Sequence, residues 1–264
     1  MVSRSDSSEA DIESIELTFE VRERVAVLAL REGQKRFSLS LLKQLHALVQ
    51  ELRQRRDIGA LWLRSESDDF SEGMNLRDPD LASVVLGGEG SRRQLAQLGQ
   101  SLIESWMSLA FPTVVSCRGN ILGAGAGLMI ASSFRFATPD ARCGFPEVGL
   151  GMTLSWGILP RLVREMGPSW ARRLVLAGEV VSMSEFDAGF SRMVPPDDLD
   201  HASFELAQCL AKKPPRAMRH TLEALHSLER DHQLLARDDE LRFALTAGSD
   251  EFVEAVGRFL GEDT

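Results

Sequence analysis

Short apolar runs and helical spacings alternate along the first two thirds of the chain. Uninterrupted apolar runs bounded by turn-forming residues predict buried strands. Apolar residues spaced three and four apart predict an amphipathic helix over Ser40 to Arg56. A second helix is expected over Arg92 to Leu109, ended by Pro112. The expected strands are Val25 to Leu30, Ala60 to Arg64, Thr113 to Cys117 and Phe134 to Ala137. Strands that alternate with helices favour an α/β core.

The pattern becomes helical after about Pro196. The expected helices there are His201 to Lys212, Arg216 to Leu228, Asp231 to Leu245 and Glu251 to Leu260. Met1 to Glu16 is polar and acidic without an apolar centre, so it predicts a flexible tail and not a signal peptide. We therefore divide the chain into a tail (1–16), an α/β core (17–196) and a helical region (197–264). Asp78-Pro79 and Gly87-Gly88 punctuate a stretch expected to be flexible and able to cover a pocket.

Composition and charge narrow the function classes. The chain has 264 residues, of which 44% are hydrophobic and 26% charged, as in a soluble domain with a sizeable core. Its net charge of −9 argues against a nucleic-acid partner. The longest uncharged run, Gly119 to Phe134, is glycine-rich and shorter than the roughly 20 apolar residues of a membrane span. The three cysteines form neither a disulfide framework nor a zinc motif. We expect a cytoplasmic protein without a membrane or metal partner.

Small residues mark the turn after the third expected strand, where Gly123, Gly125 and Gly127 alternate with alanines. Such residues let the backbone approach a ligand, and the start of a helix leaves amide N–H groups unpaired. The turn can therefore hold a developing negative charge, although alone it equally fits close packing of a helix on a sheet. It matches neither the Gly-x-x-x-x-Gly-Lys phosphate loop nor Gly-x-Gly-x-x-Gly, because the sixth position is Leu128.

Two further segments extend this candidate site. Phe70 to Leu76 follows the second expected strand and contains Gly73. Phe145 to Gly151 lies downstream of the fourth and carries Glu147 between apolar neighbours. Two loops of backbone donors with one carboxylate form a candidate site for an enolate and its acid/base.

These three segments, in this order, resemble the crotonase family, also called the enoyl-CoA hydratase/isomerase superfamily. Phe70 to Leu76 is similar to its F-x-x-G-x-D-L loop, and Gly119 to Leu128 to its N-G-x-x-x-G-G-G turn. Phe145 to Gly151 is similar to its F-x-x-P-E-x-x-x-G segment. The resemblance implies a spiral of strand–strand–helix turns over 17–196, followed by a helical region that builds a homotrimer or homohexamer.

The resemblance also implies roles for individual residues. The family holds a thioester carbonyl between two backbone N–H groups, which fall here on Met74 and Ala124. Of the two glutamates of its hydratases, one falls on Gly127 and is absent, and the other is Glu147. Hydration is helped by two carboxylates, whereas a double-bond shift needs one base that takes and returns a proton. A lone Glu147 therefore favours isomerisation.

The substrate implied by the resemblance is an acyl thioester of coenzyme A or of a carrier protein, with no separate cofactor. Its phosphates are expected near Lys35 or Arg36, and its acyl end near Ser155 and Trp156, where the family has small residues. The two turns are expected to contact it through Glu72, Gly73, Gly123, Gly125 and Gly127.

Several alternatives remain open at this point. One is hydration or dehydration, with a water held by Ser155. Another is decarboxylation of an acyl thioester in a polyketide or fatty-acid pathway, which needs the backbone donors more than a base. A third is a non-catalytic binding protein, because Asn75, Ala124 and Gly127 depart from the family motifs.

Overall fold

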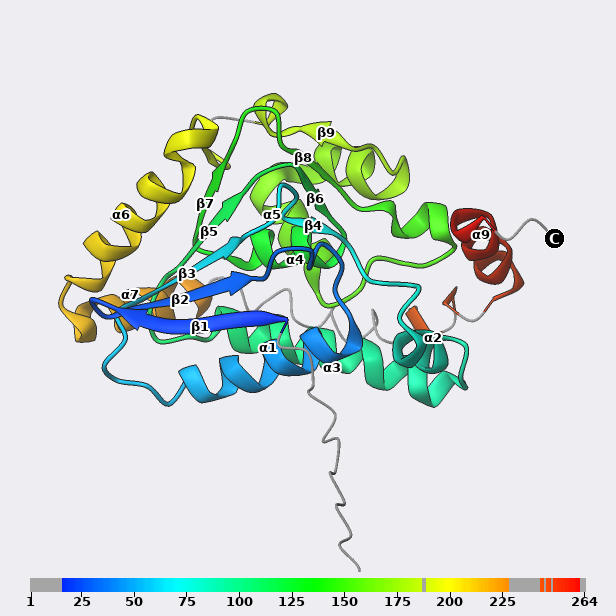
Figure 1. Ribbon diagram of the computed structural model, residues 1–264, viewed down its shortest axis with the longest axis horizontal. Coiled ribbons are helices and arrows are strands. Elements are labelled where there is room, and N and C mark those ends of the chain that lie inside the picture. Colours follow the sequence, from blue (N-terminus) through cyan, green and yellow to red (C-terminus); the bar gives the residue numbers. More distant parts are fainter. Residues whose placement is uncertain (1–15, 187–188, 228–242, 245, 248, 262–264) are drawn as a thin grey trace, which may run out of the picture.

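Two sheets lie at the centre of the computed structural model, which describes residues 16–186, 189–227, 243–244, 246–247 and 249–261 (Figure 1). The larger sheet has the order β1-β2-β3-β5-β7-β10 and the smaller β4-β6-β8-β9. All neighbours are parallel except β1 with β2 and β8 with β9. The strands are β1 (Leu17–Arg22), β2 (Val25–Leu30), β3 (Ala60–Ser65), β4 (Ser71–Glu72), β5 (Thr113–Cys117), β6 (Asn120–Leu122), β7 (Phe134–Ala137), β8 (Arg142–Gly144), β9 (Val181–Ser182) and β10 (Arg192–Met193).

Helices cover both faces of the larger sheet. Helices α1 and α3 lie side by side on one face, and α6 lies across the other (Figure 1). The helices are α1 (Leu39–Leu52), α2 (Pro79–Val85), α3 (Glu89–Met107), α4 (Ala124–Ala131), α5 (Ile158–Ala171), α6 (Leu199–Ala211), α7 (Pro215–Ser227) and α9 (Asp250–Leu260). Shorter helical turns are η1 (Pro146–Leu150), η2 (Arg172–Leu176), η3 (Met183–Glu185) and η4 (Pro196–Asp198).

Burial on both faces explains why the central strands are continuously apolar. In β2 every residue is buried. Val25 and Val27 pack in the cluster under α6, whereas Ala26 and Leu28 pack in the main core with α1. A parallel strand between two helical layers has no solvent face, so its sequence does not alternate.

The chain coils through repeated turns that each add one strand to both sheets. Strands β3 and β4 are followed by α2 and α3, then β5 and β6 by α4, and β7 and β8 by η1 and α5. Strands β3, β5 and β7 are neighbours in the larger sheet, and β4, β6 and β8 in the smaller. This confirms the predicted α/β spiral of strand–strand–helix turns.

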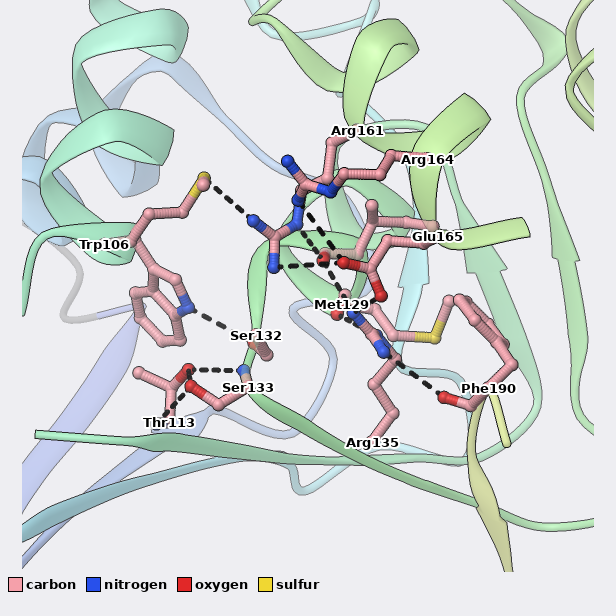
Figure 2. Close-up of polar contacts among 12 residues, drawn as sticks. Trp106, Thr113, Met129, Ser132, Ser133, Arg135, Arg161, Arg164, Glu165 and Phe190 are labelled. Carbon is pink, nitrogen blue, oxygen red and sulfur yellow. Dashed lines mark hydrogen bonds and ion pairs between the residues drawn. The ribbon is translucent and has the colours of Figure 1, made fainter. Parts of the chain in front are cut away.

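Two buried arginines hold the carboxyl end of α4 (Figure 2). The Nε of Arg135 donates to Met129 O (3.1 Å) and that of Arg161 to Ile130 O (2.7 Å). The carboxylate of Glu165 accepts from Arg135 Nη2 at 3.1 Å. Cations at a helix carboxyl end stabilise its dipole, so this cluster fixes the position of α4.

Most expected element boundaries agree with the structure, and two corrections are needed. Strands β2, β5 and β7 have the expected bounds, and β3 runs one residue further. The helix expected over Ser40 to Arg56 ends at Leu52, because the next four residues offer no apolar side chain for the core. The helix expected from Arg92 begins at Glu89 and ends at Met107.

The stretch between Asp78 and Gly88, which was expected to be flexible and able to cover a pocket, contains α2, and Leu81 and Val85 of α2 line the cavity described below. The Asp78 carboxylate accepts from Asp80 N at 3.1 Å and caps the helix, and Pro79 occupies its first turn. Leu81 and Val85, one turn apart, are buried and anchor α2 against α3.

The carboxyl-terminal part is helical, as expected, in the ranges that are described. Helix α6 covers the larger sheet, while α9 contacts η1 and lies near α2 (Figure 1). The expected helix from Asp231 to Leu245 falls mostly outside the described residues, as does the expected tail from Met1. Within the described ranges, no helix is both long and apolar enough to cross a membrane.

Candidate active site

The smaller sheet brings the three sequence motifs to one place. Its register aligns Glu72 with Leu122 and Leu122 with Gly144, at the carboxyl ends of three adjacent parallel strands. Adjacent strands lie about 4.8 Å apart. Met74 and Ala124 each follow two residues after their strand, and Glu147 three residues after β8.

The loop around Met74 is fixed by backbone hydrogen bonds to Phe37. The Phe37 N–H donates to Gly73 O and the Asn75 N–H to Phe37 O, both at 2.9 Å. The buried Ser71 hydroxyl accepts from Gly73 N at 3.0 Å, and Gly73 has a φ of +84°. Within the described part of the chain, the intervening Met74 N–H has no acceptor. It is a free donor on a residue that lines a cavity.

The second donor without an acceptor in the described part of the chain is the N–H of Ala124, the first residue of α4. A first helical residue has no acceptor within its helix. The left-handed conformation falls on Gly123 (φ +51°), and Ala124 is not among the described non-glycine residues with positive φ. A Cβ therefore causes no backbone strain at Ala124, and the alanine retains the donor.

Glu147 lies in the first turn of η1, directly after Pro146. The residue is half-buried because it lines the cavity, yet its Oε2 is fully buried without a hydrogen-bond partner. Burial raises the pKa of this carboxyl from 4.5 to about 7. Its Oε1 lies 3.1 Å from where a Cβ on Gly123 would be, a tight contact that adds to the preference for glycine at this positive φ.

A cavity of about 720 Å³ joins these groups. Its described lining contains two carboxylates, Glu147 and Glu72, and Glu72 is paired with Arg36 at 2.6 Å. Gly127 stands on the wall, where a Cβ would lie 3.3 Å from the Ile158 side chain. Glu147 is therefore the one unpaired carboxylate of the described lining.

Most of the candidate site residues lie together at this cavity. Besides the two donors and Glu147, the lining includes Arg36, Glu72, Gly73, Gly123, Gly127, Ser155 and Trp156.

Gly125 and Lys35 are not in the cavity lining. A Cβ on Gly125 would lie 2.2 Å from that of Ser71, so this glycine serves the packing of α4 against β4. Lys35 Nζ pairs with Asp69 Oδ2 at 2.8 Å, and this contact raises the pKa of the lysine.

The sequence analysis missed the apolar side of the cavity. This side consists of Leu81, Val85, Leu95, Phe243, Phe259 and Leu260, from α2, α3 and the carboxyl-terminal region. The Leu81–Val85 spacing was the available signal. Thr153 was missed as well; its Oγ1 is buried without a partner and the residue lines the cavity.

Among the described residues, no group of three or more His, Cys, Asp or Glu could hold a metal ion. The arrangement suits acid/base chemistry next to a carbonyl. A carbonyl oxygen can accept from the two amides, while Glu147 exchanges protons on the adjacent carbons.

Comparison with known proteins agrees with this fold and cavity. The sequence model of the enoyl-CoA hydratase/isomerase family matches residues 20–261, and the chain belongs to this family, within the crotonase superfamily.

Named relatives and solved structures are similar over most of the chain. A 2,3-dehydroadipyl-CoA hydratase from Escherichia coli (strain K12) is 29% identical over 260 residues, covering 94% of this chain and 97% of the relative. A probable enoyl-CoA hydratase from Bacillus subtilis (strain 168) is 27% identical over 215 residues, covering 80% and 82%. The crystal structure of an enoyl-CoA hydratase/isomerase from Xanthobacter autotrophicus Py2 has a TM-score of 0.82 at 23% identity, covering 94% of each chain.

Proposed function

We propose that this enzyme is an enoyl-CoA isomerase, in which Glu147 shifts a double bond through an enolate held by the Met74 and Ala124 amides. The observation that carries this proposal is the single unpaired carboxylate in the described lining, next to two amides without acceptors. A second carboxylate, which would help hydration, is absent at Gly127.

The reaction begins when ionised Glu147 removes a proton from the α carbon of a 3-enoyl thioester. The electrons of that C–H bond form a double bond between the α carbon and the carbonyl carbon, and the carbonyl π electrons move onto the oxygen. The product is a dienolate that still contains the β–γ double bond. The negative charge rests on the thioester oxygen between the two amides, and losing one such donor costs about 2.7–4 kcal/mol. Protonated Glu147 then gives the proton to the γ carbon, where the β–γ π electrons form the new C–H bond. The double bond at the carbonyl carbon shifts to the α–β position and the carbonyl re-forms, which gives the conjugated 2-enoyl thioester. A pKa of about 7 suits a group that must both take and give a proton near neutral pH.

The test is conversion of a 3-enoyl-CoA to its 2-enoyl isomer by the wild type and by Glu147→Gln. We expect the variant to lose about 10²- to 10⁴-fold in kcat while thioester binding persists. Glu72→Gln is the matched control, because this glutamate is ion-paired with Arg36 and should leave kcat close to that of wild type. Equal turnover by wild type and Glu147→Gln, or no turnover by a wild type that binds the thioester, would overturn the proposal.

Hydration of a 2-enoyl-CoA is the second candidate. One relative is named as a 2,3-dehydroadipyl-CoA hydratase and another as a probable enoyl-CoA hydratase, and Thr153 and Ser155 of the cavity lining carry hydroxyl groups. Thr153 Oγ1 has no partner among the described residues, so its hydroxyl is the candidate that would replace the missing glutamate in positioning a water. Incubation with a 2-enoyl-CoA separates the reactions, because hydration adds the mass of water and isomerisation leaves the mass unchanged.

Coenzyme A is the carrier we propose, because both named relatives act on thioesters of coenzyme A. Comparing matched thioesters of coenzyme A and of an acyl carrier protein tests this choice. A decarboxylase would release carbon dioxide from a carboxyacyl thioester even in Glu147→Gln. A non-catalytic binding protein would bind each thioester without converting it.

A further inference from the structure

Trp156 has an unfavourable backbone conformation on the cavity wall. Its φ of +64° is in the left-handed region, and the next residue, Gly157, also has a positive φ. A bulky residue seldom adopts this conformation, because its Cβ approaches backbone atoms. Such conformations persist where the surrounding structure fixes them, and they cluster at functional sites.

Gly99 of α3 leaves the space that the Trp156 indole occupies. It lies in the interior of α3, where a glycine lowers helix stability relative to alanine. A Cβ on Gly99 would lie 2.0 Å from both Cε2 and Nε1 of Trp156. The indole therefore occupies the space of the missing side chain, and no larger residue fits at Gly99 while the ring stays in place.

The buried Trp156 lines the same cavity as the reacting groups and the apolar side chains. Ile158, two residues beyond Trp156, packs against Gly127 on the oxyanion helix α4. On the other side, Gly99 is one helical turn from Leu95, which lines the cavity with Leu81 of α2. An acyl chain that leaves the oxyanion hole toward these apolar side chains meets the indole.

We infer that Trp156, seated on Gly99, is the end wall of the acyl subsite and restricts this enzyme to short-chain enoyl thioesters. The positive φ of Trp156 and the glycine in the interior of α3 are each locally unfavourable. Both are explained if they serve to place the indole at this point of the cavity wall. The inference rests on the proposed function in that it assumes a thioester bound between the Met74 and Ala124 amides.

The experiment measures the affinity of saturated acyl-CoAs, from butanoyl to dodecanoyl, by isothermal titration calorimetry. Each added methylene in an open apolar subsite strengthens binding about fourfold. For the wild type we expect affinity to stop rising at about hexanoyl-CoA. In Trp156→Ala and Trp156→Gly the rise should continue, so that decanoyl-CoA binds at least about tenfold tighter than to wild type. The glycine variant removes the ring and also relieves the backbone strain, so agreement between the two variants assigns the effect to the ring.

Gly99→Ala tests the contact between the ring and α3 by changing the residue beneath the ring and leaving Trp156 unchanged. The added methyl must displace the indole, so the chain-length profile should change although Trp156 is present. Gly90→Ala is the matched control in the same helix, because a Cβ there meets nothing within 4 Å and the profile should stay that of wild type. If Gly99→Ala does not fold, adding Trp156→Gly should restore folding, and a double variant that stays unfolded would overturn the pairing.

The outcomes separate this inference from the proposed function. If long chains bind the tryptophan variants more tightly but no enzyme form isomerises a 3-enoyl-CoA, the wall is supported and the isomerase proposal fails. A wild type that gains affinity through decanoyl-CoA, or variants with an unchanged profile, overturns the wall even if the isomerase is active. A protein that binds no acyl-CoA overturns both.

Discussion

Two glutamates near opposite ends of α4 occupy contrasting environments. Glu165, near the carboxyl end, lies within 3.1 to 3.7 Å of Arg135, Arg161 and Arg164 (Figure 2). Burial alone would raise the pKa of Glu165, but these cations bring it below its usual value. Glu147, near the amino end, has no cation beside its buried oxygen, and burial raises its pKa to about 7.

The contrast separates a structural carboxylate from a reactive one. At the carboxyl end of α4, helix carbonyls, arginines and Glu165 satisfy one another, which fixes the helix. At the amino end, the Ala124 amide and Glu147 Oε2 have no partner among the described residues, although native proteins rarely leave buried polar groups unpaired. Polar groups left without a partner beside a cavity are candidates for the reactive groups of a site.

The largest expected effect is on stability in Glu165→Gln. Removing this charge leaves the buried Arg135 guanidinium without the counter-ion that it has among the described residues, which should cost about 3–5 kcal/mol of unfolding free energy near pH 7. Urea denaturation followed by circular dichroism measures it. The matched control is Glu179→Gln, which breaks a half-exposed pair with Arg173 and should cost at most about 1 kcal/mol. Equal losses in the two variants would contradict the structural role of Glu165.

Glu147→Gln should change stability in the opposite direction. Because the folded pKa of Glu147 is above its value in the unfolded chain, the folded state holds the proton more tightly. Stability therefore falls as pH rises from about 4.5 to about 7. The variant removes this penalty and should gain up to about 3 kcal/mol above pH 7, and nothing below about pH 4. Urea denaturation at about pH 8 and pH 4 measures the difference, and a loss of stability at the higher pH would mean that Glu147 has a partner.

The pH dependence of turnover tests the same carboxyl without a mutation. The base must be ionised to accept the first proton, so kcat/KM should fall about tenfold per pH unit below about 7. Initial rates of 3-enoyl-CoA isomerisation between about pH 5 and 8 provide the profile. A plateau that extends down to about pH 5 would place the reactive carboxylate in a solvated or paired environment.

The smallest expected effect is that of Ala124→Gly, which introduces the residue found in the family motif. Since Ala124 has no positive φ, glycine relieves no strain and retains the N–H. We expect kcat/KM to change by less than about threefold and stability to fall by less than about 1 kcal/mol. A large gain in activity would show that the alanine side chain obstructs the oxyanion.

The sequence predicted four of the six strands of the larger sheet, β2, β3, β5 and β7, because these strands carry their own signal, whereas the largely exposed β1 and the two-residue β10 were not predicted. Runs such as Val25–Leu30 and Thr113–Cys117 are buried on both faces, so burial alone specifies them. The smaller sheet was not predicted, because β4, β6 and β8 have only two or three residues each. Pairing with neighbouring strands, and not local composition, makes these segments strands.

The site shows the same division between local and distant information. The motifs located Met74, Ala124 and Glu147, and their catalytic roles stay predictions until activity is measured. The seat of Trp156 on Gly99 was not predictable, since nothing local to either residue indicates the other. The link between Arg135 and Glu165 was missed for the same reason, as it arises only when α5 packs beside α4.

The alignment of the three reacting groups on adjacent strands of the smaller sheet has an evolutionary consequence. Their spacing follows from the hydrogen-bonded register of β4, β6 and β8, which does not depend on the length of the helices between successive turns. Those helices, α2 and α3 among them, supply the apolar side of the cavity. Insertions or substitutions in the helices can therefore accumulate and change which molecules are admitted, while the reacting groups keep their positions. The strands that position the reacting groups can therefore stay the same during evolution, while the helices that line the cavity change the range of substrates.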